Sequence, residues 1–422
     1  MRAARALGVA LVVVVLAGCG SPAGGGGGSP AAELRIGAMF PLGGSVAADA
    51  RDEYLGAQLA AQMVNDGGGV AGRRISFDLR DLESGDQAVA LAASLHHDGV
   101  AAVLGAYSSA LSIPAAAAVA REGMVYWETG AVADQVTGQA QPLVFRVGAN
   151  GANLGGNSGR FVVGQLAPLL QRAPASLRAF LVTADDAYAH SVADAARASL
   201  GAGGVSVVGE SVYNPSLAVP DWSGAVAAIR AASPDILLLS SHIPDGISFR
   251  RAFLSAGLHV DAFIGTTMAQ CLPDFGDALG ADAVGVFASD RPDRSFNAAG
   301  LSAEAQALYG RFSQVWQQRT GRAPSEEGIS GFSAAWALFH SVLPAARSLD
   351  ARGIAAAARG VDLPEGSLPN GGGLRFQSSG DQLGQNLRAA AVIWQWQAVR
   401  HSVVVWPPAY ATGTIAMVPL PR

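Results

Sequence analysis

The segment VAAVLGAYSSALSIPAAAAVAREGMVYWETG, residues 100–130, decides the predicted fold. Its apolar run at residues 100–104 predicts a buried strand, residues 113–122 predict a helix, and residues 124–127 predict a second strand. A helix between two strands returns the chain to the same sheet in the same direction, so these strands should be parallel. The segment is therefore one unit of a parallel sheet covered by helices.

The same alternation extends toward the N-terminus. Strands are predicted at residues 34–40 and 75–80, and helices at residues 52–66 and 86–97. This βαβαβα order predicts an α/β fold with a doubly wound parallel sheet covered on both faces.

The alternation restarts after residue 150, which predicts a second α/β unit. Further strands are predicted at residues 179–183, 205–209, 235–239, 262–265 and 284–288. Further helices are predicted at residues 153–170, 188–200, 221–231, 249–256, 304–320 and 326–347. Two such units in one chain predict two lobes with a cleft between them. Late strands at residues 389–397 and 402–405 indicate that the chain crosses between the lobes more than once.

The composition excludes some classes of protein. Half of the chain is hydrophobic and only 14% is charged, yet beyond the N-terminus no run approaches the ~18 apolar residues of a membrane-spanning helix. The net charge of −5 argues against a nucleic-acid surface, so we expect no nucleic-acid partner.

The N-terminus has the pattern of a secretory signal. Arg2 and Arg5 precede an apolar run at residues 7–16, and small residues then lead to Cys19. The ending Leu-Ala-Gly-Cys resembles a bacterial lipoprotein box, which implies lipidation of Cys19 and a lipid anchor outside the cytoplasm. The alternative is an ordinary signal peptide with an incidental cysteine.

These features give the first two segments of the chain. We assign residues 1–18 to the signal peptide and residues 19–32 to the lipidated cysteine and a flexible, glycine-rich tether. If Cys19 is acylated, Cys271 has no partner for a disulfide. We expect Cys271 to be a buried structural thiol.

The predicted strands end in polar residues, and ligands of open parallel sheets bind beyond the carboxyl ends of the strands. These ends carry Tyr107, Ser108 and Ser109; Glu128, Gly130 and Ala131; Asp186 and Tyr188; His242; and Thr266 and Thr267. Ser108 and Ser109 run straight into a helix, whose free N–H groups and two hydroxyls could bind a carboxylate. The alternative for Ser109 is that it only caps the helix. Together the polar ends favour a small polar ligand.

Catalytic and metal-binding motifs are weak. The sequence has no G-x-S-x-G elbow, no H-E-x-x-H, no C-x-x-C and no phosphate loop. His96 and His97 lie at a helix end, where a solvated pair is the simpler interpretation. We expect no enzyme activity, no metal and no cofactor.

Residues along most of the chain resemble a known family. The matching stretches are IGAMFPL from residue 36, GAQLA at 56–60, VNDGGGVAGRRI at 64–75, VLGAYSSA at 103–110, PLVFRV at 142–147, Asp186-x-Tyr188 and PDWSGAVAAIRAASPDILLL at 220–239. In this order they resemble the periplasmic Leu/Ile/Val-binding proteins, the type I solute-binding components of ABC importers.

The resemblance implies two Rossmann-like lobes that are joined by three crossovers and close over a ligand. The crossovers are expected near residues 148–151, 289–292 and 376–385. The expected first lobe is residues 33–148 plus 290–378, and the expected second lobe is residues 149–289 plus 379–410.

The resemblance also implies site residues. The loop of Ser108 and Ser109 and the loop of residues 130–132 would hold an α-carboxylate, and Tyr188 would be the aromatic residue of the second lobe. Val132 departs from the family, which often has Thr there, although its backbone could still bond. Thr266 and Thr267 stand where leucine binders place an ammonium-binding Glu. The usual disulfide is absent, with Tyr107 near one of its positions.

Glu128 has two possible roles. It could face a cationic group of the ligand, together with Asp186, and replace the missing acid of the other lobe. It could instead accept bonds from neighbouring N–H groups or pair with Arg146. The candidate ligand-binding residues are Tyr107, Ser108, Ser109, Glu128, Gly130, Ala131, Val132, Asp186, Tyr188, His242 and Thr267.

The leading functional hypothesis is a solute-binding lipoprotein of an ABC importer. It would be a monomer that captures a small polar ligand, such as an amino acid, and partners with permease subunits. A ligand-sensing receptor subunit of the same fold is the second hypothesis and an enzyme the third.

Overall fold

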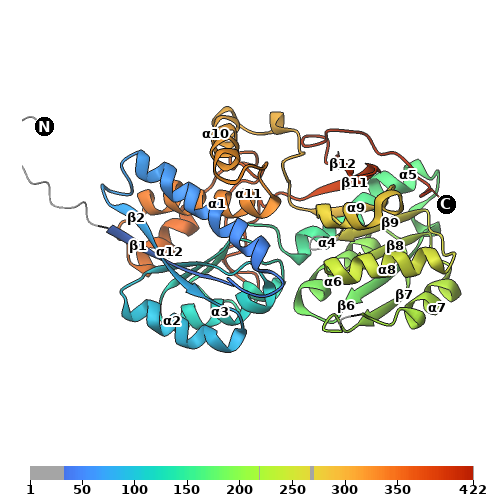
Figure 1. Cartoon of the computed structure of the whole chain (residues 1–422), viewed down its shortest axis with the longest axis horizontal. Coiled ribbons are helices and arrows are strands. Elements are labelled where there is room, and N and C mark those ends of the chain that lie inside the picture. The colour runs from blue at the N-terminus through green and yellow to red at the C-terminus, as the bar shows by residue number, and fades with distance from the viewer. Residues whose placement is uncertain (1–32, 218, 267–269, 422) are drawn as a thin grey trace, which may run out of the picture.

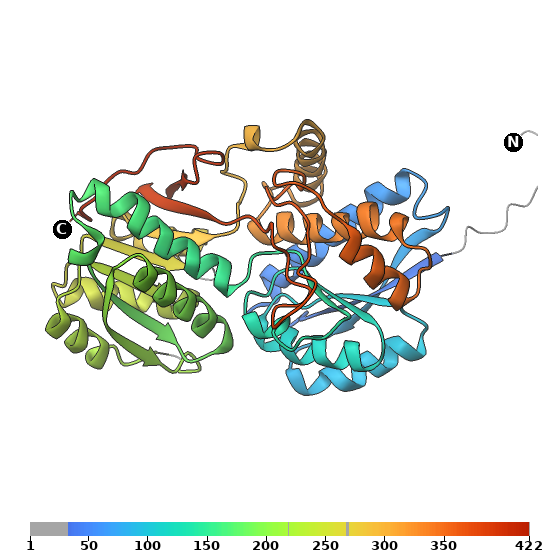
Figure 2. The same ribbon diagram turned by 180° about the vertical axis from the view of Figure 1, so that it is seen from behind.

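The computed structural model describes residues 33–217, 219–266 and 270–421. It shows two α/β lobes side by side, and Figures 1 and 2 show that both lobes contain an open sheet with helices on its faces. The predicted fold class, an α/β protein of two hinged lobes with parallel sheets, is confirmed. Two predicted residues, Cys19 and Thr267, lie outside the described residues.

The first lobe is built on a five-stranded sheet with the order β2-β1-β3-β4-β5, in which every pair is parallel. Its strands are β1 (Glu33–Phe40), β2 (Arg74–Asp81), β3 (Ala102–Gly105), β4 (Val125–Glu128) and β5 (Val144–Arg146). One face packs on α2 (Ala88–His97) and α3 (Ser109–Arg121). The other face packs on α1 (Ala47–Asp66), α10 (Ala303–Thr320), α11 (Glu326–Trp336) and α12 (Ala351–Gly360). The late helices therefore complete a lobe that the first residues begin.

The second lobe has a seven-stranded sheet with the order β12-β11-β10-β9-β8-β6-β7. Its strands are β6 (Arg178–Ala184), β7 (Ser206–Tyr213), β8 (Ile236–Ser240), β9 (Ala262–Thr266), β10 (Phe287–Asp290), β11 (Val392–Ala398) and β12 (His401–Trp406). Strands β11 and β12 are antiparallel to their neighbours, and the other pairs are parallel.

Helices cover both faces of this sheet. One face carries α4 (Gly151–Phe161), α5 (Ala167–Leu169) and α6 (Ala187–Ala202). The other carries α7 (Ser223–Ala232), α8 (Ile243–Ser255) and α9 (Pro273–Leu279).

The chain passes between the two sheets three times. It leaves β5 for α4, leaves β10 for α10, and returns to β11. The third passage comes later than residues 376–385, because this stretch is a hairpin on the first sheet: Phe376 pairs with Asn386, and the N–H of Arg146 donates to Gly384 at 3.0 Å. Residues 379–386 thus belong to the first lobe, which differs from the expected boundary at 379.

Helix α3 begins at Ser109, four residues before the predicted start at residue 113. Ser108 is its N-cap residue in extended conformation. Both candidate serines are therefore part of the helix start. Within the described part of the chain, no helix is both long and apolar enough to cross a membrane.

Candidate ligand-binding site

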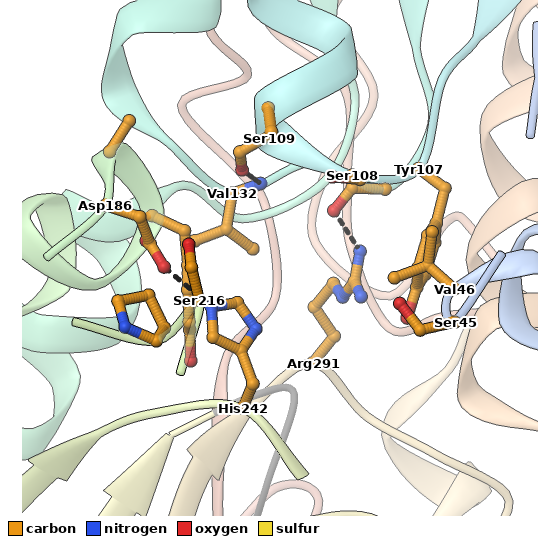
Figure 3. Close-up of a pocket in the computed structure, with 15 residues that line it drawn as sticks. Ser45, Val46, Tyr107, Ser108, Ser109, Val132, Asp186, Ser216, His242 and Arg291 are labelled. Atoms are coloured by element: carbon orange, nitrogen blue, oxygen red, sulfur yellow. Dashed lines mark hydrogen bonds and ion pairs between the residues drawn. The ribbon is translucent and has the colours of Figure 1, made fainter. Parts of the chain in front are cut away.

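Loops from both lobes enclose a cavity of about 490 Å³, which we call the first chamber. It is lined by Ser45, Val46, Tyr107, Ser108, Ser109, Ala110, Gly130, Val132, Asp186, Ala187, Tyr188, Pro215, Ser216, His242 and Arg291. Figure 3 labels ten of them and shows Ser108, Asp186, His242 and Arg291 around one space. Eight of the eleven candidates line it: Tyr107, Ser108, Ser109, Gly130, Val132, Asp186, Tyr188 and His242.

The start of α3 supplies hydrogen-bond donors to this chamber. The first N–H groups of a helix have no partner within the helix, and the helix dipole favours an anion there. Ser108 makes no capping hydrogen bond with its side chain. The hydroxyl of Ser109 accepts from the N–H groups of Val132 at 3.2 Å and Ala133 at 3.0 Å. Ser109 thus ties the helix start to the loop after β4; Ser108, not Ser109, is the N-cap residue, and contact of Ser109 with a ligand stays a prediction.

Tyr107 lines the chamber with an unusual backbone. Its φ of 71° lies in the left-handed region, which costs free energy for a residue with a side chain and is typical of functional loops. Its hydroxyl donates to Asp49 at 3.2 Å. This turn directs the chain from β3 into α3.

Arg291 is the one arginine of the chamber lining, and the sequence analysis did not identify it. It is only 3% exposed. Two of its nitrogens lie 2.8 Å from the carboxylate oxygens of Glu326, and a third donates to the carbonyl of Gly130 at 2.7 Å. Burial alone would lower the pKa of Arg291, but the charges of Glu326 and Asp290 raise it above its ordinary value. The chamber therefore contains a permanent positive charge, and Figure 3 shows it facing Ser108.

Glu128 does not line the chamber and is fully buried. One of its oxygens accepts from the N–H groups of Thr129, Gly130 and Ala131 at 3.0, 2.8 and 2.7 Å, and the other accepts from the hydroxyl of Tyr126 at 3.1 Å. Burial raises the pKa of Glu128, against the opposing effect of these and other hydrogen bonds. The carboxylate thus accepts bonds from neighbouring N–H groups and holds the turn after β4, as in the second alternative, and its role toward a ligand stays a prediction.

Backbone groups of the loop of residues 130–132 are hydrogen-bonded to other residues of the protein. Arg291 donates a hydrogen bond to the carbonyl of Gly130, and Arg146 donates one to the carbonyl of Ala131 at 3.2 Å. Ala131 does not line the chamber. The N–H of Val132 donates to Ser109, so its backbone is already bonded, and Val132 contributes an apolar wall.

The second lobe closes the opposite side. Asp186 caps α6 by accepting from the N–H of Ala189 at 2.9 Å, and its other oxygen lies 2.6 Å from Nε2 of His242. Burial alone would lower the pKa of His242, but Asp186 raises it, and His242 in turn lowers the pKa of Asp186 against its burial. The Tyr188 hydroxyl lies 2.8 Å from that of Thr266. Asp186 therefore already has a hydrogen-bonding partner in His242, and its contact with a cationic ligand stays a prediction.

Seven lining residues were not predicted, three of them with polar side chains, and a signal existed in the sequence for two of these three. Arg291 follows β10 directly, and Ser45 follows β1, so both obey the rule of strand ends. Ser216 lies in a loop after β7 and carried no signal of this kind.

Comparisons with known proteins agree with this architecture. A family model described as periplasmic binding protein matches residues 33–394. The Leu/Ile/Val-binding protein homolog 8 of Brucella abortus (strain 2308) is 29% identical over 369 residues, covering 87% of this chain and 89% of that protein.

Two solved structures have a similar fold. The leucine-binding protein LivK from Thermotoga maritima MSB8 is 17% identical with a TM-score of 0.72, covering 88% of this chain and 98% of that one. A solute-binding protein of an ABC transporter from Rhodopseudomonas palustris BisB5, in complex with 3,4-dihydroxybenzoic acid, is 18% identical with a TM-score of 0.66, covering 86% and 93%. With its two lobes, its interlobe chamber and the match over residues 33–394, this chain belongs to the periplasmic binding protein family.

Proposed function

We propose that the protein is the solute-binding subunit of an ABC importer and that it captures a small ligand with a carboxylate group in the first chamber. The observation that carries this proposal is the pairing of a buried, permanently charged Arg291 with the start of α3 in one interlobe cavity. A guanidinium and free helix N–H groups are the donors that a carboxylate prefers.

The ligand's carboxylate would lie beside Ser108 and Arg291, which face each other in Figure 3. The hydroxyl of Ser108 and the N–H groups of Ser109 and Ala110 would donate to it from the first lobe. Tyr188 and His242 of the second lobe would cover the rest of the ligand, with ring centroids 5.3 Å apart. Each lobe holds part of the contact surface, so a bound ligand favours the closed state by its contacts with both lobes.

The similar proteins support a carboxylate as the shared feature of the ligand. The Brucella relative is named for leucine, isoleucine and valine, and the Rhodopseudomonas structure contains an aromatic acid. Both kinds of compound carry a carboxylate, while their other ends differ.

The proposal includes an anchor and a partner. Acylation of Cys19 would hold the protein on the outer face of the cell membrane, where the glycine-rich tether lets it reach permease subunits as a monomer. A Cys19→Ser variant should then move from the membrane fraction to the soluble fraction of the cells; if it stays in the membrane fraction, the anchor lies elsewhere.

A thermal-shift screen tests the ligand class. The purified protein is heated with L-amino acids, aromatic acids and their amides, which lack the carboxylate. A ligand at a hundred times its dissociation constant adds ~2.7 kcal/mol of stability. We expect stabilisation by at least one acid and none by its amide. Equal stabilisation by acid and amide would contradict the proposal.

A further inference from the structure

A second cavity of about 720 Å³ adjoins the first chamber and also lies between the lobes; we call it the second chamber. The two share the lining residues Ser45, Val46, Pro215 and His242, so they are parts of one cleft. The two chambers are also linked by a hydrogen bond. Tyr107 lines the first chamber, and its hydroxyl donates to Asp49, which lines the second.

The second chamber is acidic, in contrast to the first. Five carboxylates line it: Asp49 and Asp52 of α1, Asp245 of α8, Asp274 of α9 and Glu327 of α11. Its basic lining residues are Arg322 and His242. Arg322 pairs with Asp52 and His242 pairs with Asp186. Among the residues that the structure describes, the other four carboxylates form no ion pair.

Asp245 supplies an independent sign of a missing partner. It is 5% exposed, and its Oδ2 accepts a hydrogen bond from the hydroxyl of Tyr213. Its Oδ1 is buried and has no hydrogen-bond partner among the described residues. A buried, unsatisfied carboxylate oxygen is costly, and this one belongs to a residue of the chamber wall.

A metal ion is a poor candidate for this partner. In the described part of the chain, no group of three or more His, Cys, Asp or Glu side chains is arranged to hold one. The acids come from four helices of both lobes and surround a chamber with apolar walls at Val46, Leu217 and Leu272. An ammonium or guanidinium group on an organic chain fits this mixture of charge and apolar surface.

We propose that the second chamber holds a cationic group of the same ligand whose carboxylate lies in the first chamber. The ligand is thus an extended zwitterion, with an ammonium or guanidinium group several bonds away from its carboxylate. Basic amino acids and short peptides with a free amino end have this chemistry. This inference rests on the proposed function and adds the class of ligand to it.

Matched pairs of compounds test the inference, because the members of each pair differ mainly in the distal charge. The pairs are L-arginine with L-citrulline, L-lysine with L-norleucine, and L-alanyl-L-alanine with its N-acetyl derivative. Isothermal titration calorimetry on the purified protein measures the dissociation constants. In at least one pair the cationic member should bind ten times more tightly or better.

Substitutions then locate the charge preference. Asp245→Asn and Asp274→Asn each remove one carboxylate from the second chamber, and Asp274 is exposed, so its variant should fold normally. Asp277→Asn is the matched control, since Asp277 lies on the same helix but pairs with Arg400 and lines a different cavity. We expect the first two variants to weaken the cationic compound about tenfold and its neutral partner less than twofold, and Asp277→Asn to change neither.

The outcomes separate the inference from the proposed function. If neutral and cationic members bind equally well, or if Asp277→Asn has the same effect as Asp274→Asn, the inference is overturned while carboxylate capture stands. If no carboxylate-bearing compound of the pairs or of the thermal-shift screen binds, both are overturned. Thermal unfolding of each ligand-free variant verifies that the fold is intact.

Discussion

The two chambers of the cleft differ in how their charged groups are neutralised. In the first chamber, Arg291 is bonded to Glu326, and Asp186 is bonded to His242. In the second chamber, the lining acids Asp49, Asp245, Asp274 and Glu327 form no ion pair with any described residue. The charged groups of the first chamber thus have partners within the protein, whereas these four acids of the second chamber have no ion-pair partner among the described residues.

The first chamber is preorganised for its ligand group, whereas the acids of the second chamber gain an ion-pair partner only when a cationic ligand binds. A paired and hydrogen-bonded Arg291 keeps one orientation, so it can meet a carboxylate without rearranging. A buried carboxylate without a cation, such as Asp245, costs stability in the ligand-free protein. A cationic ligand that pairs with it removes this cost and therefore binds more tightly. Each end of the cleft can therefore be tested through its own energetic signature.

The largest expected effect on stability comes from removing Arg291 from its ion pair with Glu326 in the first chamber. Arg291→Met leaves the carboxylate of Glu326 buried without its cation, and the loss of one partner of a buried pair costs about 3–5 kcal/mol. We expect the free energy of unfolding, measured by urea denaturation, to fall by this amount. The same variant should lose carboxylate binding.

A double substitution is the control for this prediction. In Arg291→Met/Glu326→Gln both charges are absent, so the loss of stability should be smaller than in Arg291→Met alone. If the double variant is as unstable as the sum of the two single variants, the pairing between these residues is not what holds this end of the cleft.

The next effect concerns the unpaired end and depends on pH. Burial, and then the charge of Asp49, raise the pKa of Glu327 from 4.5 to about 8. Between these values the folded protein holds a proton that the unfolded chain has released, so the free energy of unfolding falls as pH rises. The slope is at most about 1.4 kcal/mol per pH unit, and the total by pH 8 is on the order of 2–4 kcal/mol.

Glu327→Gln should flatten this dependence. The variant and the original protein should be similar at pH 5, while at pH 8 the variant should be more stable by about 2–4 kcal/mol, because its side chain has no proton to lose. Glu365→Gln, at an exposed position, is the control and should leave the pH profile unchanged. Parallel profiles for Glu327→Gln and the original protein would show that this acid is not held protonated by its surroundings.

The sequence predicted the fold and part of the first chamber for a common physical reason. Hydrophobic periodicity and polar strand ends are local properties, so they located the two lobes and brought Ser108, Tyr188 and His242 to one cavity. Arg291 was missed because the predicted strand ended at residue 288, whereas β10 runs to Asp290. An error of two residues placed Arg291 in a linker instead of at a strand end.

The second chamber could not be predicted in this way. Its carboxylates belong to α1, α8, α9 and α11, and no spacing in the sequence brings these helices together. The hairpin of residues 376–386 was not predicted for a related reason, because hydrogen bonds to the distant Arg146 fix its position. Contacts between distant segments decide both features, and a single sequence does not display them.

Glu128 gives the smallest predicted effect and completes the comparison of carboxylates. It is fully buried, and three N–H groups and a hydroxyl satisfy it, whereas the buried Asp245 of the second chamber has an oxygen without a hydrogen-bond partner among the described residues. Glu128→Gln keeps an acceptor for these groups and loses only the added strength of a charged one, so stability should fall by about 1–2 kcal/mol.

The ligand affinity of Glu128→Gln should change less than twofold, because Glu128 does not line the chamber. Ser108→Ala is the matched variant, at the end of the adjacent strand. Its hydroxyl makes no capping bond, so its loss should leave stability almost unchanged and weaken a carboxylate ligand about tenfold. Calorimetry measures the affinity and urea denaturation the stability of both variants. If Glu128 serves folding and Ser108 serves binding, Glu128→Gln loses stability and keeps its affinity, whereas Ser108→Ala keeps its stability and loses affinity. A large loss of affinity in Glu128→Gln at unchanged stability would instead show that Glu128 contributes to ligand binding.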